Sequence, residues 1–150
     1  MQEILLARLY EYIRDNNPEL LIALQQEGNV SSYLRKKVAA VDLLMNELLA
    51  AGTPAYIMEE RCMDKLTKEL RPSKFIYLIS ILEEEFEDDY YRLKVSGLLT
   101  YEAINLLESC STVFETLGFT EENEADRHLH YAITGIVKEY FEKQTVKVKR

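Results

Sequence analysis

The sequence predicts an all-α protein, an antiparallel bundle of about six helices in a single domain over residues 1–150. Three observations support this class: apolar residues recur at three- and four-residue spacing, the connections between periodic segments are short, and the chain contains only 5 Gly and 3 Pro. A chain of 150 residues suits one domain and removes roughly 70% of its unfolded surface from water. We therefore expect one common core that needs neither a metal nor a disulfide.

The first expected helix covers residues 3–15 and ends at two asparagines. Its apolar residues form two adjacent stripes at i, i+4, i+7 spacing, which is typical of a helix with one buried side. Asn17, Pro18 and Glu19 then have the pattern of an N-cap, a proline at the first helical position and an acid in the first turn. This pattern predicts a short second helix over 18–26, ended by a glycine.

A longer helix is expected from Ser31 or Ser32 to about Ala51. Its apolar positions are spaced by four, three, four and three residues, which predicts a seam that packs along another helix. These positions are Leu34, Val38, Val41, Met45 and Leu48. Gly52 would end this helix, and Pro54 would take the first position of the next, so that the two helices form a hairpin.

Three more helices are delimited by breakers and hydroxyl caps. The hairpin's second helix ends at Pro72, a serine caps the following helix, and Thr100 and Thr120 begin the last two. A loop is expected within 83–97, because six acids crowd a helix C-terminal end, where the macrodipole disfavours negative charge. The tail over 145–150, in which Val and Lys alternate, is expected to be mobile.

The cysteines and the apolar segments predict a cytoplasmic location. Cys62 and Cys110 form neither a CxxC pair nor a metal-binding spacing, and each falls within an apolar helical pattern. Buried reduced thiols of this kind are uncommon in oxidising compartments. The N-terminus lacks the uninterrupted apolar core of a signal peptide, and the charge-free stretches are too short for a membrane span.

Negative charge is concentrated in one part of the chain. The formal net charge is −8, and residues 83–126 carry 13 acids and two bases, a net charge of −11 that leaves +3 elsewhere. This balance disfavours direct binding to nucleic acid or to anionic membranes. The densest run, called the acidic pole here, comprises Glu83, Glu84, Glu85, Glu87, Asp88 and Asp89. It is interpreted first as a solvated helix end, and otherwise as a cation site, a docking patch for a basic partner, or a mimic of nucleic-acid phosphates; an EF-hand is not expected, because the run contains no glycine.

No catalytic or cofactor motif is present, so we expect no cofactor, no metal and no enzyme of a recognised type. Phosphate-binding glycine loops, GxSxG, HExxH and kinase signatures do not occur. Glu124, Asp126, His128 and His130 are the one group that resembles a metal or acid–base site. Glu124 with His128 and Asp126 with His130 are i, i+4 pairs. The two pairs lie on different sides of a helix and cannot converge on one ion, so surface ion pairs are expected.

The leading hypothesis is an interaction module that binds another protein, or itself as a homodimer. It would use the acidic pole and a tyrosine-bearing face that includes Tyr90 and Tyr91. Such tyrosines are also typical of core edges with solvated hydroxyls. A second hypothesis is an acidic DNA mimic that inhibits a nucleic-acid enzyme, which requires carboxylates spaced like duplex phosphates. A third is an enzyme of unrecognised type, which requires a concave pocket with convergent polar groups.

Four short phrases, in order, resemble a known family. They are Asn17-Pro18-Glu19-Leu20, Leu70-Arg71-Pro72-Ser73, Ile81-Leu82-Glu83-Glu84-Glu85-Phe86 and Ile133-Thr134-Gly135. This set resembles an uncharacterised, domain-of-unknown-function family of small all-helical bacterial proteins, often encoded on conjugative or mobile elements of gut-type bacteria. Asn17 stands where the family has His, and the Arg71-Pro72 pair alters the approach to Ser73. The resemblance implies the fold class and a genomic setting, and it carries over no functional residue.

Overall fold

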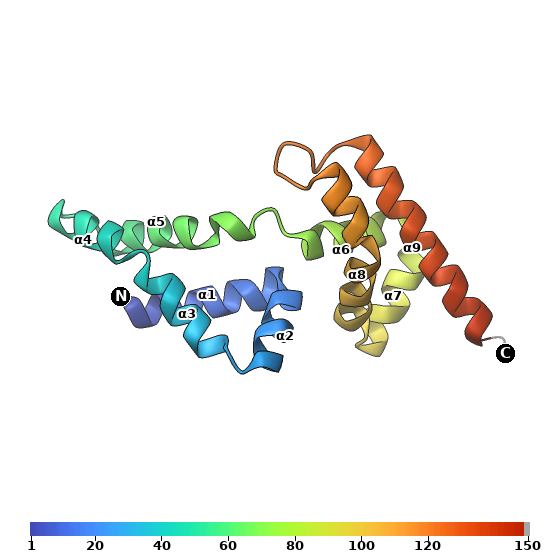
Figure 1. Cartoon of the computed structure of the whole chain (residues 1–150), viewed down its shortest axis with the longest axis horizontal. Helices are drawn as coiled ribbons and strands as arrows, with labels where there is room; N and C mark the ends of the chain where they lie inside the picture. The colour runs from blue at the N-terminus through green and yellow to red at the C-terminus, as the bar shows by residue number, and fades with distance from the viewer. Residues whose placement is uncertain (149–150) are drawn as a thin grey trace. The chain divides into compact units, whose positions relative to one another are not determined.

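The protein is all-helical, as the computed structural model in Figure 1 shows. The structure describes the backbone of residues 1–148 and the side chains of residues 1–144. Within residues 1–148 it contains nine α-helices and one 3-10 helix, and no strand. The all-α prediction is confirmed, but the expected number of about six helices does not match.

The chain divides into two compact units, Met1–Arg71 (unit 1) and Pro72–Arg150 (unit 2). The buried apolar side chains described form two separate clusters, one in each unit, where the sequence predicted one common core. Arg71, the last residue of unit 1, is extended (φ −106°, ψ 142°). A residue before proline is pushed out of the helical region by the proline ring, so Pro72 interrupts the helical chain at this boundary.

Helix α1 is the centre of unit 1, since α2, α3 and α5 all pack on it. Its residues Leu5, Leu9 and Ile13 are buried at i, i+4, i+8 spacing, which gives the helix one continuous inner stripe. The elements of unit 1 are α1 (Gln2–Asn16), α2 (Pro18–Glu27), α3 (Val30–Ala39), α4 (Asp42–Ala50), α5 (Ala55–Thr67) and the 3-10 helix η1 (Lys68–Leu70). The first two helices match the ranges predicted from the sequence.

Asn17 lies at the corner between α1 and α2 but does not cap α2 through its side chain. Its Nδ2 instead donates to the carbonyl oxygen of Leu70, 3.5 Å away, and so connects this corner to η1. The proline predicted at the first position of α2 is present. The local pattern therefore predicted where the helix begins, whereas a tertiary contact determined what the asparagine binds.

The helix predicted from Ser31 or Ser32 to Ala51 is divided into α3 and α4. The break lies at Val41, whose backbone (φ −101°, ψ 7°) leaves the helical region while its side chain is buried. The two parts pack on different partners, α3 on α1 and α4 on α5. The break therefore lies where the packing partner changes, within a segment whose sequence pattern is continuous.

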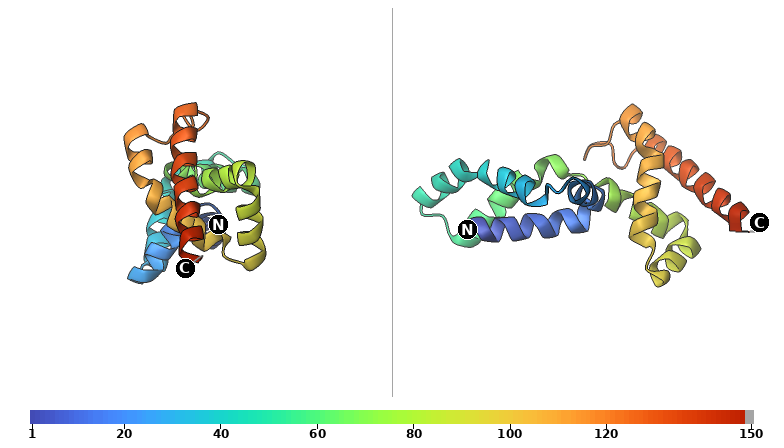
Figure 2. Two further views of the ribbon diagram at one scale, coloured as in Figure 1. Left: turned by 90° about the vertical axis from the view of Figure 1, so that its right-hand side faces the viewer. Right: turned by 60° about the horizontal axis from the view of Figure 1, so that its bottom comes forward.

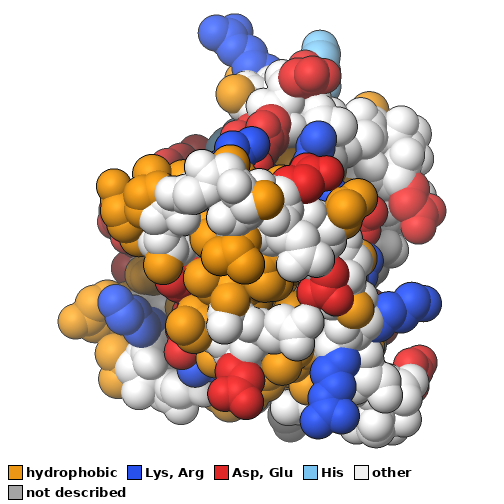
Figure 3. All heavy atoms as spheres, turned by 90° about the vertical axis from the view of Figure 1, so that its left-hand side faces the viewer, with side chains coloured by type: hydrophobic (Ala, Val, Ile, Leu, Met, Phe, Trp, Pro, Cys, Tyr) orange, Lys and Arg blue, Asp and Glu red, His pale blue; other side chains and the backbone are white. Residues whose placement is uncertain are grey.

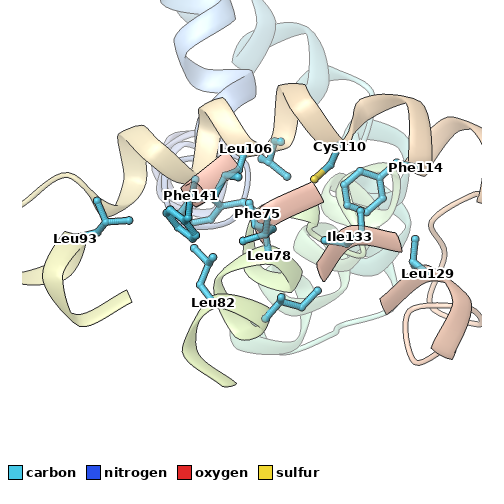
Figure 4. Close-up of a cluster of buried hydrophobic side chains, with 14 residues drawn as sticks. Phe75, Leu78, Leu82, Leu93, Leu106, Cys110, Phe114, Leu129, Ile133 and Phe141 are labelled. Atoms are coloured by element: carbon cyan, nitrogen blue, oxygen red, sulfur yellow. The ribbon is translucent and has the colours of Figure 1, made fainter. Parts of the chain in front are cut away.

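Over residues 72–148, unit 2 contains four helices around its own core, which is shown in Figure 4. Helix α6 packs on α7 and α8, and α8 also packs on α7 and α9. These elements are α6 (Lys74–Glu85), α7 (Glu87–Ser96), α8 (Leu99–Leu117) and α9 (Arg127–Val148). Ser73 caps α6 as predicted, since its Oγ accepts a hydrogen bond of 3.0 Å from the backbone N–H of Ile76.

The loop expected within 83–97 is instead a sharp corner followed by helix α7 (Figure 1). Helix α6 ends at Phe86 (φ −136°, ψ 51°), so that Glu87, Asp88 and Asp89 fall in the first turn of α7. Negative charge is favourable at the N-terminal end of a helix. The prediction instead assigned all six acids to the C-terminal end of the preceding helix, where negative charge is unfavourable. Phe86, Tyr90 and Leu93 then pack against the core of unit 2.

Helix α9 begins at Arg127, later than the start predicted at Thr120. Asp126 caps it, and its Oδ1 accepts hydrogen bonds from the backbone N–H groups of His128 (2.8 Å) and Leu129 (3.1 Å). Figure 2 shows the irregular connection between α8 and α9 that replaces the expected first turn. The predicted tail over 145–150 begins inside α9, which continues to Val148, and residues 149–150 lie outside the described part of the chain.

Candidate functional site

The acidic pole lies at the corner between α6 and α7. A depression at this corner is lined by five of its six acids together with one aromatic residue. The lining residues are Glu84, Glu85, Phe86, Glu87, Asp88 and Asp89. The corner therefore brings carboxylates from the end of one helix and the start of the next onto one concave surface, and the remaining acid, Glu83, does not line it.

One arginine and one histidine lie within ion-pair distance of these acids. Arg92 Nη2 lies 3.2 Å from Asp89 Oδ1, and His130 Nε2 lies 3.5 Å from Glu85 Oε1. Within the part of the chain whose side chains are described, the remaining acids of the pole form no ion pair, namely Glu83, Glu84, Glu87 and Asp88. The depression is thus a surface of excess negative charge on which carboxylate oxygens are available as acceptors.

The two predicted tyrosines point in different directions. Tyr90 packs against the core of unit 2, and Lys94 Nζ lies 5.8 Å from the centroid of its ring. Tyr91 is 68% exposed. Because successive residues of a helix differ by about 100° in direction, only one of two adjacent tyrosines is available on the outer surface.

Val95 is an exposed apolar residue of this surface that the sequence analysis did not identify. It is 73% exposed and lies one helical turn beyond Tyr91, which in turn lies one turn beyond Glu87. We call Glu87, Asp88, Tyr91 and Val95 the outer face of α7. Glu87, Tyr91 and Val95 follow one another at i, i+4 spacing. This spacing would have identified Val95 if a helix, and not a loop, had been predicted for this segment.

The histidine group of the sequence analysis is dispersed. Asp126 caps α9, Glu124 lies in the turn before it, and neither forms the predicted i, i+4 ion pair with His128 or His130. His130 instead reaches Glu85 on α6, a contact between distant residues that no local pattern indicates. No group of three or more His, Cys, Asp and Glu residues suited to a metal ion occurs among the described residues.

Apart from Arg14, whose pKa the adjacent Asp15 carboxylate raises, the groups with raised pKa values lie in or beside the two cores, and none of them lines the acidic depression. Both cysteines are free and buried, as expected. Burial raises the pKa of Cys110 to about 12 and also raises that of Cys62. A thiol with so high a pKa stays protonated at neutral pH and is a poor nucleophile. Burial, followed by the Glu102 carboxylate, raises the pKa of Tyr140 to about 12.

Comparison with family models, curated proteins and solved structures found no match for this chain. The resemblance to the bacterial family of unknown function therefore stays a prediction. Among the described residues, no helix is both long enough and apolar enough to cross a membrane.

Proposed function

We propose that the protein is an interaction module in which unit 2 binds a basic partner protein through the acidic pole and the outer face of α7. The observation that supports this proposal is the depression lined by five acids and Phe86. It continues along α7 into two exposed apolar residues, Tyr91 and Val95. Two buried free thiols support a cytoplasmic setting for the module.

The surface combines two kinds of interaction. Unneutralised carboxylates attract Lys and Arg over a Debye length of about 8 Å at physiological salt and so guide the encounter. Tyr91 and Val95 then offer apolar area that becomes buried in a complex. Since Glu87 and Val95 are eight residues apart, they are separated by about 12 Å along the helix. The partner should carry its basic and apolar residues at a similar separation.

The arrangement supports docking better than the alternatives. A mimic of DNA requires carboxylates spaced along one face like duplex phosphates, whereas five acids here share one depression at a helix corner. A homodimer formed by two acidic poles would bring like charges together. An enzyme requires convergent groups with perturbed protonation in its pocket, and the groups with raised pKa values lie elsewhere.

The test is capture of partners by the tagged full-length protein from an extract of its native cells, with the captured proteins identified by mass spectrometry. One variant neutralises the depression with Glu84→Gln, Glu87→Gln and Asp88→Asn. A matched control makes the same change in net charge at three exposed acids in the connection between α8 and α9 of the same unit. These control substitutions are Glu121→Gln, Glu122→Gln and Glu124→Gln.

We expect the native protein and the control variant to capture the same Lys- and Arg-rich partner, and the depression variant to lose at least about tenfold of it. Capture should weaken as salt concentration rises, because exposed charges are screened. A further variant, Tyr91→Ser, should reduce capture without changing the salt dependence. Equal capture by the depression and control variants would exclude the acidic pole as the docking surface.

A further inference from the structure

Helix α4 in unit 1 has two strongly exposed apolar residues, while Leu44 and Met45 are half-buried against the core of this unit. Five of its nine residues are large and apolar, and only Leu48 among them is buried. Leu43 is 71% exposed and Leu49 is 67% exposed. A helix that is apolar on several sides is normally covered on those sides, so α4 has a surface that a partner would cover.

One side of α4 faces a groove. A depression of about 620 Å³ lies between the first turn of α1 and α4, within the roughly 300–1,000 Å³ range of ligand-binding cavities. Its lining residues are Met1, Gln2, Glu3, Ile4, Asp42, Met45 and Asn46. Gln2 Nε2 donates a 2.9 Å hydrogen bond to Asp42 Oδ1 and so connects the two walls.

The floor of this groove is apolar and adaptable. Met1, Ile4 and Met45 supply its apolar lining, and Leu49 lies one helical turn beyond Met45. We call the lining residues Met1, Glu3, Ile4, Asp42 and Met45, together with the exposed Leu49 that extends this surface along α4, the α1–α4 groove. Flexible methionine side chains are common on surfaces that accept apolar side chains of varying shape. Figure 3 shows hydrophobic side chains gathered on the side where Figure 1 draws α4 and the N-terminus.

The rim carries two acids, Glu3 and Asp42, and one base lies nearby, since Arg35 lines a neighbouring depression together with Glu3. Residues 38–60, which include α4 and the start of α5, contain no Lys or Arg and four acids, Asp42, Glu47, Glu59 and Glu60. Arg8 of α1 pairs with Glu59 at 2.8 Å. Glu3 and Asp42, the acids that line the groove, have no ion pair among the side chains described.

We infer that the α1–α4 groove is a second docking site, which binds an amphipathic helix of a partner protein whose apolar stripe is flanked by Lys or Arg. The apolar floor would accept the stripe, and Glu3 and Asp42 would pair with the flanking cations. Helix α4 has nine residues and is about 13 Å long, so the groove suits two to three turns of the incoming helix. This site lies in unit 1 and is independent of the function proposed for unit 2.

Charge also decides against a second copy as the occupant. A two-fold contact of this groove with itself would bring Glu3 and Asp42 of one copy close to the same carboxylates of the other. Like charges at such a contact oppose association. A helix flanked by Lys or Arg removes that repulsion and adds favourable pairs.

The test measures binding of a fluorescein-labelled synthetic peptide of about 15 residues to the full-length protein by fluorescence anisotropy. The peptide has Leu at i, i+3, i+4 and i+7 positions, Lys on both flanks of this stripe and Ala elsewhere. A second peptide replaces each Lys with Glu. The groove variant combines Ile4→Ser with Leu49→Ser, and a charge variant combines Glu3→Gln with Asp42→Asn.

Two controls separate the groove from other exposed apolar surfaces. Leu43→Ser with Tyr56→Ser removes two residues of unit 1 that are exposed but do not line the groove. Tyr91→Ser with Val95→Ser removes the apolar part of the outer face of α7. All substituted apolar residues are exposed, so circular dichroism should show unchanged helicity in every variant.

We expect saturable binding of the Lys peptide, weakened at least about tenfold by the groove variant and about fivefold by the charge variant. Both controls should bind as the native protein does, and the Glu peptide should bind more weakly. Absence of saturable binding, equal binding of the two peptides, or equal weakening by the unit 1 control would overturn the inference.

Two other results would assign the groove differently. If the native protein is a dimer that the groove variant converts to a monomer, measured by analytical ultracentrifugation, a second copy occupies the groove and the inference is wrong. If only the α7 control abolishes peptide binding, the peptide binds the outer face of α7. That result would overturn the inference for α4 and leave the proposed function of unit 2 intact.

Discussion

The hydroxyl of Tyr77 in α6 is buried and has no hydrogen-bond partner among the described residues. Its ring packs edge to face against Phe114 and Phe119, with centroid distances of 6.2 and 5.1 Å. Burial, followed by the nearby Asp126 carboxylate, raises the pKa of Tyr77. The ring therefore stabilises unit 2, whereas the buried hydroxyl opposes folding because it has lost its hydrogen bonds to water.

We expect Tyr77→Phe to increase the free energy of unfolding by about 1 kcal/mol, since it removes an unsatisfied hydroxyl and keeps the ring. Urea denaturation followed by circular dichroism measures the change. Tyr101→Phe, at an exposed tyrosine of α8, is the matched control and should leave stability unchanged. A loss of stability in Tyr77→Phe would show that the hydroxyl has a partner in solution.

Tyr140 of α9 connects to α8 through its hydroxyl, which donates a hydrogen bond to Glu102. Gln144 Nε2 donates to the same carboxylate at 3.1 Å. The pKa of Tyr140 rises from 10 to about 12, because burial and then the Glu102 carboxylate disfavour the phenolate. A group whose pKa is higher in the folded state stabilises the fold below its unfolded pKa and loses that effect as pH rises through the folded pKa.

Stability should therefore fall between pH 10 and about 12, and it should fall less steeply in Tyr140→Phe, which cannot ionise. Urea denaturation at a series of pH values measures the two slopes. Other ionisable groups contribute to both proteins, so the difference between the slopes is the informative quantity. Parallel curves would contradict a role for Tyr140.

At the scale of single elements, the end of α7 is determined by one glycine. Gly97 has a left-handed backbone (φ 77°), which allows the N–H of Leu98 to bond the carbonyl of Leu93 at 2.9 Å. Residues with a Cβ rarely adopt this conformation. Helix α7 can then turn into α8 within two residues, so this glycine helps to position the outer face of α7.

Two Gly→Ala substitutions in unit 2 should have opposite effects. Gly97→Ala should reduce the free energy of unfolding by about 1 kcal/mol, because alanine is strained at a positive φ. Gly135→Ala in α9 meets no heavy atom within 4 Å and should increase stability by roughly 0.5–1 kcal/mol, because alanine favours a helix. Urea denaturation of both variants tests this. If both substitutions changed the free energy of unfolding in the same direction, the result would be inconsistent with the backbone conformations of the two glycines.

At the scale of the whole molecule, the two units differ in charge and each has its own core. Unit 1 has 9 bases and 11 acids, a net charge of −2, and unit 2 has 9 bases and 15 acids, a net charge of −6. The two proposed docking surfaces lie in different units, the α1–α4 groove in unit 1 and the acidic pole in unit 2. A protein with two such surfaces would connect two partners, each carrying basic and apolar residues.

Separate cores predict separate responses to core mutations. Leu9→Ala in unit 1 and Ile133→Ala in unit 2 each remove a fully buried side chain and should destabilise their own unit by about 3 kcal/mol. Hydrogen exchange measured by mass spectrometry should show the loss of protection within 1–71 for the first variant and within 72–148 for the second. Loss of protection across both ranges in both variants would show that the units unfold together.

The sequence by itself predicted the helical class and many helix ends. The Asn17-Pro18 start of α2, the glycine that ends α2 and the Ser73 cap of α6 were all identified correctly. These signals are local: a cap, a proline or a glycine acts on backbone groups within a few residues of its own position. The burial of both cysteines was also predictable, because each lies on an apolar helical stripe.

The tertiary structure alone decided the break at Val41, the helix at 87–96, the separation into two cores and the side on which each tyrosine lies. The acidic pole could be identified from composition, but its concave form depends on the corner at Phe86. The α1–α4 groove joins residues 40 positions apart in the sequence, such as Gln2 and Asp42, and no local pattern relates them. Each of these features depends on which helices pack together, and packing is set by contacts between distant residues.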